Sequence, residues 1–301
     1  MLALVSVALL FAPAVVNPGD LDTTYQKLKD AVTAKQVAQV KDLAAQTSVL
    51  ARQIINSPAP TDDDEKQQWN DRLTFAREVD VYSEYALYAT AVGASPETVV
   101  DLIGALEQQN PKSKYLDQGY GLYYHALQQT GAAAKILGIA EKAVENLPDN
   151  DDSLAVLAES LFARKQSERA LGYANRLIAV ANKRARPEGM PANEWERKRA
   201  TELASGYWIA GVAEAEKASY YDADRNLRAA LPLVTGSDAR KAVAFFYLGL
   251  ANYQLGKMTM KKSLVLEAMK FSQQAAAIQG PLAQQAWHNA QVMRDEAAKM
   301  R

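Results

Sequence analysis

The sequence contains no cysteine among its 301 residues. Disulfide bonds, thiol catalysis, thiolate metal sites and a lipid-modified N-terminal cysteine are therefore excluded. Histidine is nearly absent too, with only His125 and His288. No HExxH motif, phosphate-binding glycine loop or dinucleotide-binding fingerprint is present. We therefore expect no cofactor and no metal site.

The sequence also lacks an excess of charge of either sign. It carries 34 basic and 35 acidic side chains, for a formal net charge of −1. Proteins that bind nucleic acids or anionic membranes need basic surfaces. We therefore expect no nucleic-acid partner.

The N-terminal apolar run, residues 2–16, is too short to cross a bilayer as a helix. Within it, Ala12-Pro13-Ala14 has the small–x–small form of a signal-peptidase site, and polar sequence begins near Asn17. A basic segment ahead of the run is missing. We expect residues 1–16 to be a signal peptide and the mature chain to be periplasmic or secreted, with no integral membrane span. The alternative is an N-terminal helix packed on the rest of a cytoplasmic protein.

Helical periodicity fills the chain after this run. Residues 17–79 are expected to form N-terminal helices that are a degenerate repeat. The second of these helices keeps a helical period through Val40, Leu43, Ala44, Val49, Leu50 and Ile54. The proline-containing segment Ser57–Pro60 ends it, and Thr61 or Asp62 is expected to cap the helix that follows.

From residue 80 onward the helices fall into pairs with one recurring spacing. Gly211 is followed, after 12, 16 and 19 residues, by three apolar residues on one stripe of the next helix: Ala223, Leu227 and Ala230. We expect this stripe to face Gly211, where the absent side chain allows a close approach. In three other pairs the same spacing separates a residue of the first helix from the apolar residues of the second. These first-helix residues are Leu87, Tyr124 and Ala158. Proline follows the second helix of two pairs, at Pro111 and Pro148.

Two stretches lengthen this spacing. Residues 184–196 insert a proline- and glycine-rich loop in which Asn193 is expected to cap the next helix. In the last pair, led by Gly249, about seven extra residues fall around Lys257–Ser263. A more polar final helix, within residues 281–301, is expected to cap the stack.

These patterns resemble tetratricopeptide repeats, which are arrays of helical pairs about 34 residues long. The likeness covers residues 80–280 and is best around Tyr207-x-x-Ala210-Gly211 and Phe245-x-x-Leu248-Gly249. The chain departs from the family where larger residues replace the small glycine. The resemblance implies an all-α fold, an α-solenoid of stacked helix-turn-helix repeats with a C-terminal capping helix.

The resemblance further implies a concave groove, lined by the first helix of each pair, for a peptide or protein partner. Aromatic side chains in such a groove offer a large contact area at a small entropic cost. Seven residues are expected to project from the inner helices: Tyr88, His125, Glu159, Phe162, Trp208, Phe246 and Tyr253. For each aromatic residue the alternative is packing between repeats. We expect no basic and asparagine-rich clamp for a C-terminal carboxylate.

Catalytic candidates are few. His125 lies among tyrosines on an expected helix, which favours a groove or core position over a general base. The acidic runs Asp62–Glu65 and Asp149–Asp152 lack the ligand pattern of a calcium loop and are interpreted as helix caps. We therefore expect a non-catalytic protein–protein interaction scaffold of the bacterial envelope. The alternatives are a cytoplasmic adaptor and a repeat-built enzyme or sugar-binding protein, which a pocket with converging perturbed carboxylates would favour.

Overall fold

The computed structural model describes residues 18–187 and 189–300, so the expected signal peptide lies outside the described part of the chain. Within these ranges the protein is all-helical and contains no strand. None of the helices described is both long and apolar enough to cross a membrane.

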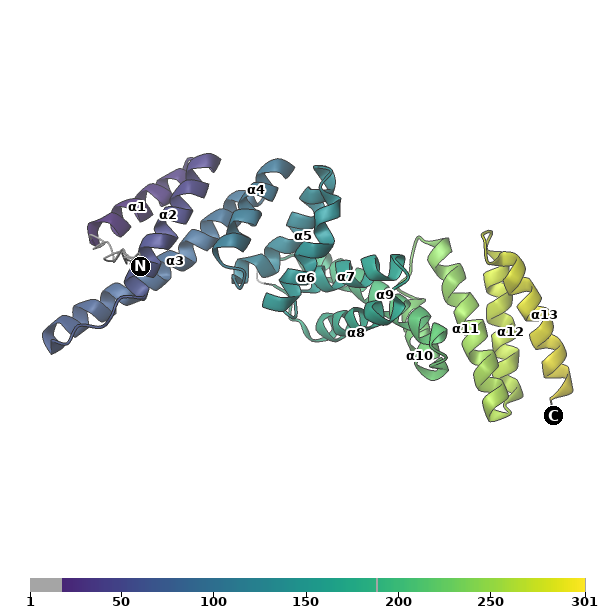
Figure 1. The fold of residues 1–301 in the computed structure, drawn as a ribbon. Helices are drawn as coiled ribbons and strands as arrows, with labels where there is room; N and C mark the ends of the chain where they lie inside the picture. The colour runs from purple at the N-terminus through teal and green to yellow at the C-terminus, as the bar shows by residue number, and fades with distance from the viewer. Residues whose placement is uncertain (1–17, 188, 301) are drawn as a thin grey trace, which may run out of the picture. The chain divides into compact units, whose positions relative to one another are not determined.

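The chain divides into two compact units between Ala133 and Ala134. Unit 1 holds five α-helices (Figure 1): α1 (Pro18–Thr33), α2 (Val37–Ile55), α3 (Asp63–Ala91), α4 (Pro96–Gln109) and α5 (Lys114–Gln129). A 3₁₀ turn, η1 (Ala133–Lys135), crosses the division. Unit 2 holds the remaining helices: α6 (Ile136–Asn146), α7 (Asp151–Ala163), α8 (Ser167–Lys183), α9 (Ala192–Glu216), α10 (Tyr220–Ala230), α11 (Asp238–Thr259), α12 (Lys262–Ala277) and α13 (Ala283–Lys299).

Inside each unit every helix packs on the next one along the chain (Figure 1). Alternate helices also touch, as in α1 with α3 and α3 with α5 in unit 1, and α7 with α9 and α9 with α11 in unit 2. Consecutive stacking of this kind gives each helix two buried flanks, as in an α-solenoid. The predicted all-helical, stacked architecture is therefore confirmed, and α13 ends the stack in unit 2 by packing on α12 and α11.

The helices begin where polar caps stand in the sequence. The side chain of Asp62 accepts a hydrogen bond from the Asp64 backbone N–H, which confirms the predicted cap of α3. Ser95 caps α4 in the same way, and Pro96 occupies the first turn, where its missing N–H costs nothing. Asn150 caps α7 through the N–H of Ser153.

Five of the turns between helices close with the same backbone geometry. In each, a residue with positive φ follows the first helix: Lys35, Gly131, Lys165, Ala218 and Met260. The N–H of the next residue then donates to a carbonyl five residues back, as from Gln166 to Leu161 at 2.9 Å and from Ser219 to Glu214 at 2.9 Å. This is the Schellman arrangement, which satisfies carbonyl groups left open at a helix end.

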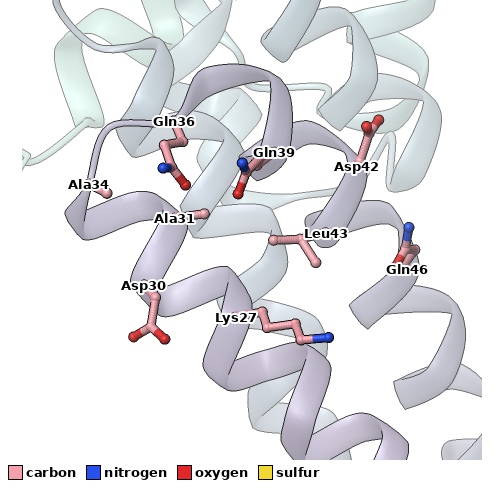
Figure 2. Close-up of a pocket in the computed structure, with 9 residues that line it drawn as sticks. All are labelled: Lys27, Asp30, Ala31, Ala34, Gln36, Gln39, Asp42, Leu43 and Gln46. Carbon is pink, nitrogen blue, oxygen red and sulfur yellow. The ribbon is translucent and has the colours of Figure 1, made fainter.

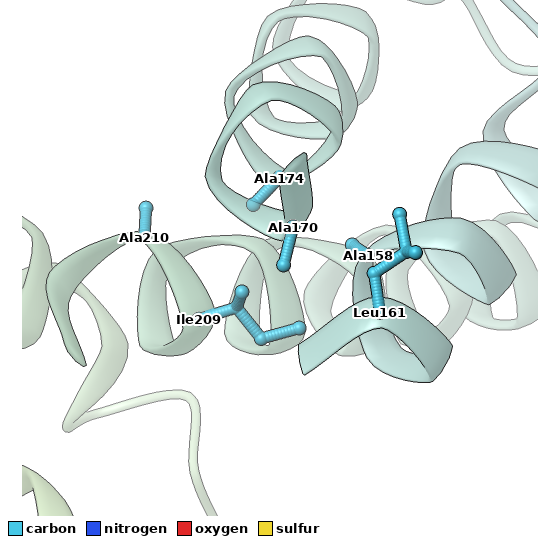
Figure 3. Packing of buried hydrophobic residues seen from close by; sticks show 6 residues of the cluster. All are labelled: Ala158, Leu161, Ala170, Ala174, Ile209 and Ala210. Atoms are coloured by element: carbon cyan, nitrogen blue, oxygen red, sulfur yellow. The ribbon is translucent and has the colours of Figure 1, made fainter. Parts of the chain in front are cut away.

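The recurring spacing predicts the helix contacts of unit 2 correctly. A Cβ atom added to Gly211 would lie 2.5 Å from Leu227 Cγ, so α9 and α10 meet at this glycine. The three apolar residues of that stripe are fully buried: Ala223, Leu227 and Ala230. The pair led by Ala158 packs the same way, and Figure 3 shows the six buried side chains that join α7, α8 and α9: Ala158, Leu161, Ala170, Ala174, Ile209 and Ala210.

Several local expectations are wrong. Val49, assigned to the apolar face of α2, is 57% exposed, and Thr47 and Ser48 take the buried positions instead. Asn193 does not cap α9, because the helix already begins at Ala192 after Pro191 and has no side-chain cap.

Three other expected boundaries fall elsewhere. The extra residues near Lys257–Ser263 mostly lengthen α11, which runs to Thr259. The expected boundary between residues 79 and 80 lies inside the continuous helix α3. The division between the units separates Tyr124 from the helix with which the spacing pairs it.

Candidate functional site

The seven expected groove residues are divided between the two units. Tyr88 and His125 belong to unit 1, on α3 and α5. The other five belong to unit 2: Glu159, Phe162, Trp208, Phe246 and Tyr253. Each unit therefore presents its own set of candidate binding residues.

In unit 2, Glu159, Phe162 and Trp208 lie together with Arg240. Arg240 belongs to the N-terminal end of α11. The ring of Phe162 meets the ring of Trp208 edge to face, with centroids 5.2 Å apart. The indole N–H of Trp208 donates to the backbone carbonyl of Arg240 at 2.9 Å. The Arg240 guanidinium lies over the same indole, 5.5 Å from its centroid. The indole is thus fixed by α7 on one side and α11 on the other.

Glu159 completes this arrangement. Its Oε1 atom accepts a hydrogen bond from Ser205 at 2.6 Å and lies 3.2 Å from Arg240 Nη2. The side chains of Arg240 and Glu159 remain 42% and 50% exposed. We call Glu159, Phe162, Ser205, Trp208 and Arg240 the tryptophan cluster. It offers a partner a half-buried indole beside one exposed cation and one exposed carboxylate.

The other two expected residues of unit 2 serve packing. Phe246 is only 8% exposed and belongs to a buried cluster with Ala275 and Ala286, against which α12 and α13 close. Tyr253 packs on another such cluster, which includes Val265 and Met293. Phe246 therefore presents little surface to a partner, whereas Tyr253 is half-buried, with the ammonium of Lys257 5.6 Å from its ring centroid.

In unit 1, Tyr88 is half-buried, and burial raises the pKa of its hydroxyl. The hydroxyl donates to Gln118 at 3.3 Å, and the ring stacks on Tyr115 at 5.9 Å. His125 lies exposed on α5. Tyr88 therefore bridges α3 to α5, whereas His125 stands free of the ring contacts around it.

Tyr88 proves to be one end of a chain of ring contacts that spans α1, α3 and α5. The rings touch in this order: Phe75, Tyr25, Tyr82, Tyr85, Tyr115 and Tyr88. We call these six residues the tyrosine strip. Sequence reasoning found only Tyr88. Phe75, Tyr82 and Tyr85 share its helical spacing on α3, but Tyr25 and Tyr115, which connect them, come from α1 and α5. The dense tyrosines of α3 were the one available signal.

A group of buried charges joins α7 to α9 in unit 2. Asp151, at the start of α7, is 1% exposed, and its Oδ1 atom lies 3.0 Å from Arg184 and 3.2 Å from Lys198. Lys198 also lies 2.8 Å from Asp152 Oδ1 and 3.4 Å from Glu202 Oε1. Two carboxylate oxygens, Asp151 Oδ2 and Glu202 Oε2, have no hydrogen-bond partner among the described residues.

This group, the acidic cluster, shifts the protonation of its members. Burial, together with the neighbouring charge of Asp151, raises the pKa of the Glu202 carboxyl to about 7 against the opposing effect of Lys198. Burial likewise raises the pKa of Asp152. Burial alone would lower the pKa of Lys198, but the charges of Asp152 and Asp151 raise it above its ordinary value.

The acidic cluster is also the one carboxylate group, among the described residues, whose geometry could hold a metal ion. One oxygen each from Asp151, Asp152 and Glu202 lie within 4.8 Å of one another. The ammonium of Lys198 already contacts all three. The arrangement therefore works as a buried ion-pair network that ties α7 to α9.

An open hollow of about 520 Å³ lies between α1 and α2 in unit 1 (Figure 2). Amide and charged side chains make up most of its wall, including Gln36, Gln39, Asp30 and Asp42. The hollow lacks the convergent titratable groups of a catalytic pocket.

No protein-family model matches this sequence, and no curated protein is significantly similar to it.

Proposed function

We propose that this protein is a non-catalytic scaffold of the tetratricopeptide type that binds a peptide or protein partner. The observation that carries this proposal is the tryptophan cluster. Trp208 is held by contacts from α7 and α11, while Glu159 and Arg240 remain half-exposed beside it. A rigid aromatic anchor with hydrogen-bonding groups at its rim is the usual composition of an interface hot spot.

The location proposed for this scaffold is the bacterial envelope. The support is the apolar run of residues 2–16 with its small–x–small site. N-terminal sequencing of protein from its native host tests this point. A mature chain that starts near Asn17 agrees with export, and a chain that still starts at Met1 contradicts it.

The binding role is tested by crosslinking and affinity capture with the full chain. We expect Trp208→Ala and Arg240→Glu to weaken capture of the same partner by at least ~10-fold, as truncation of a hot spot does. Trp287→Ala is the matched control, since Trp287 is 60% exposed on α13, away from the cluster.

Thermal unfolding separates lost contact from lost fold. Arg240→Glu changes a side chain that is 42% exposed and should lower the unfolding temperature only slightly, because the ion pair with Glu159 that it replaces by a repulsion is exposed to solvent. Capture that survives both Trp208→Ala and Arg240→Glu would remove the tryptophan cluster as the binding surface.

A second candidate function, a repeat-built enzyme or sugar-binding protein, is favoured by one observation. The carboxylates of Asp151, Asp152 and Glu202 converge, and the pKa of Glu202 is raised to about 7, in the range of a general acid. Calorimetric titration with neutral oligosaccharides tests it. Heat of binding that disappears in Glu202→Gln would favour this candidate over the scaffold.

A further inference from the structure

The tyrosine strip is a second surface, separate from the tryptophan cluster, and the structure gives it a defined chemistry. The rings of Tyr25, Tyr82, Tyr85 and Tyr115 follow one another with centroid distances of 5.2, 5.8 and 5.6 Å. Their planes are tilted rather than stacked in parallel, at 83°, 52° and 55°. The strip is therefore a continuous row of ring edges and faces across three helices.

One ring of this row is exposed, and the other five are half-buried. Tyr85 is 42% exposed, and two valines of the same helix, Val81 and Val92, are 42% and 55% exposed. The acidic residue between them, Glu84, is buried and accepts a hydrogen bond from Asn110. The segment from Val81 to Val92 thus presents apolar and aromatic side chains without an exposed charge. Apolar side chains exposed together in this way mark a binding surface rather than an ordinary solvated face.

Two lysines stand beside the rings. The ammonium of Lys29 lies 4.5 Å from the ring centroid of Tyr25, and that of Lys114 lies 5.1 Å from that of Tyr115. In the part of the chain that the structure describes, neither lysine forms an ion pair. Nearby, Arg72 is paired with Asp22. A ligand that reaches from Tyr25 to Tyr115 therefore meets an unpaired cation at each end.

The two lysines and the length of the tyrosine strip indicate which class of ligand it can bind. Three ring-to-ring steps separate Tyr25 from Tyr115, a path that roughly five residues of extended peptide cover at about 3.3 Å per residue. An acidic peptide supplies carboxylates for the two lysines and apolar side chains for the rings. A neutral glycan supplies no carboxylate, and two cations are too few for the phosphate backbone of a nucleic acid.

We propose that the tyrosine strip binds an extended acidic peptide whose apolar side chains lie on Tyr82, Tyr85 and Tyr115 and whose carboxylates pair with Lys29 and Lys114. Glu78, exposed one turn before Tyr82, lies at the N-terminal side of this segment of α3 and repels an acidic ligand there. The peptide therefore follows the path from α1 to α5 rather than the length of α3.

The experiment is fluorescence anisotropy with the full chain and a labelled peptide of sequence EFELEFE. We expect saturable binding that Tyr85→Ala weakens at least ~10-fold and that Lys29→Glu and Lys114→Glu each weaken about 3- to 10-fold. Salt should weaken binding in the unmodified chain and should do so less in the lysine variants, because the ion pairs are screened.

Two control variants and one control peptide test whether binding is specific to the tyrosine strip. Tyr221→Ala removes a tyrosine that is 65% exposed in unit 2 and should not change binding of the peptide. Trp208→Ala should not change it either, which distinguishes this proposal from the proposed scaffold function. The charge-reversed peptide KFKLKFK should bind at least ~10-fold more weakly than EFELEFE.

Three results would overturn the proposal. The first is absence of binding by EFELEFE, and the second is equal binding by KFKLKFK. The third is a Tyr85→Ala variant that keeps full affinity although its circular dichroism and unfolding temperature match those of the unmodified chain. If sedimentation shows that the chain self-associates and that Tyr85→Ala abolishes this, the strip is an interface between copies of the chain and the peptide assignment is wrong.

Discussion

The two units of this protein bring their helices together in different ways. In unit 2 four helical glycines lie where a Cβ would come within 3 Å of a neighbouring helix: Gly206, Gly211, Gly249 and Gly256. In unit 1 the approaches at Gly104 and Gly119 are looser, with an added Cβ 3.2 Å from the Tyr123 hydroxyl and 3.4 Å from Ile103 Cδ1. At its four positions unit 2 therefore uses the absence of a side chain to pack more closely than unit 1 does at these two.

Unit 1 joins its helices in part through polar side chains that are buried or half-buried. Asp80 on α3 accepts hydrogen bonds from Ser48 at 2.6 Å and Arg52 at 3.1 Å, both on α2. Glu84 on the same helix accepts from Asn110, at the end of α4, at 2.7 Å. These bonds fix the orientation of α3 against α2 and against the end of α4. The same stacked fold thus tolerates two kinds of contact, and the one in unit 1 coincides with the exposed tyrosine strip.

The strongest way to test this comparison is Gly211→Ala in unit 2. The new Cβ would lie 2.5 Å from Leu227 Cγ and 3.0 Å from the Leu227 backbone nitrogen, so α9 and α10 must move apart. We expect the free energy of unfolding to fall by about 3 kcal/mol, measured by urea denaturation.

Gly172→Ala is the matched control for this substitution. Gly172 lies inside α8, and no atom lies within 4 Å of its added Cβ. Alanine favours helix over glycine by about 1 kcal/mol, so this variant should be slightly more stable. If the two variants have equal stability, close approach is not what distinguishes unit 2.

A smaller effect is expected for Asp80→Ala in unit 1. The change leaves the buried hydroxyl of Ser48 and the Nε–H of Arg52 without their acceptor, although Arg52 Nη1 still donates to the Gln109 carbonyl. We expect a loss of about 2 kcal/mol in the free energy of unfolding, measured by the same denaturation. In the control Asp101→Ala, the lost partner is an exposed Lys41, and the cost should stay below about 0.5 kcal/mol. Equal costs would mean that the polar contacts of unit 1 are not structural.

The smallest expected effect concerns the pH dependence of unit 2. The pKa of Glu202 rises from its ordinary 4.5 to about 7 in the folded protein. The folded state therefore keeps a proton that the unfolded chain loses near pH 4.5. The stability that Glu202 contributes is complete below that pH and is lost as the pH rises to about 7.

Glu202→Gln should remove this slope. We expect the variant to match the unmodified chain near pH 4.5 and to exceed it at pH 8 by on the order of 1 kcal/mol, measured as unfolding free energy across pH. A stability of the unmodified chain that rises from pH 5 to pH 8, and a variant that follows the same curve, would show that Glu202 ionises normally.

The fold was largely predictable from the sequence because its contacts are local. The stripe of Ala223, Leu227 and Ala230 faces Gly211 as its spacing predicts. Val49 was misassigned for a physical reason that lies outside the helix. Burial of Ser48 is made favourable by Asp80, which lies 32 residues away in the sequence.

The candidate sites were only partly predictable for the same reason. Glu159, Phe162 and Trp208 were expected and do lie together, but Arg240, which closes their cluster, follows 81 residues after Glu159. The acidic cluster needs Glu202 beside Asp151, and no spacing within one helix brings these two residues together. Contacts between distant helices depend on how the pairs stack, which the repeat pattern alone does not specify.

The Schellman turns carry a consequence for how such a chain can change. Three of the residues with positive φ are Lys165, Ala218 and Met260, which share no side-chain chemistry, so backbone geometry alone makes these hairpins equivalent. Each of these turns lies inside one hairpin, so a hairpin inserted or deleted as a whole between two pairs leaves the turns of the adjoining hairpins intact. The number of hairpins in such a chain can therefore change one at a time. The side chains that the other hairpins expose need not change with it.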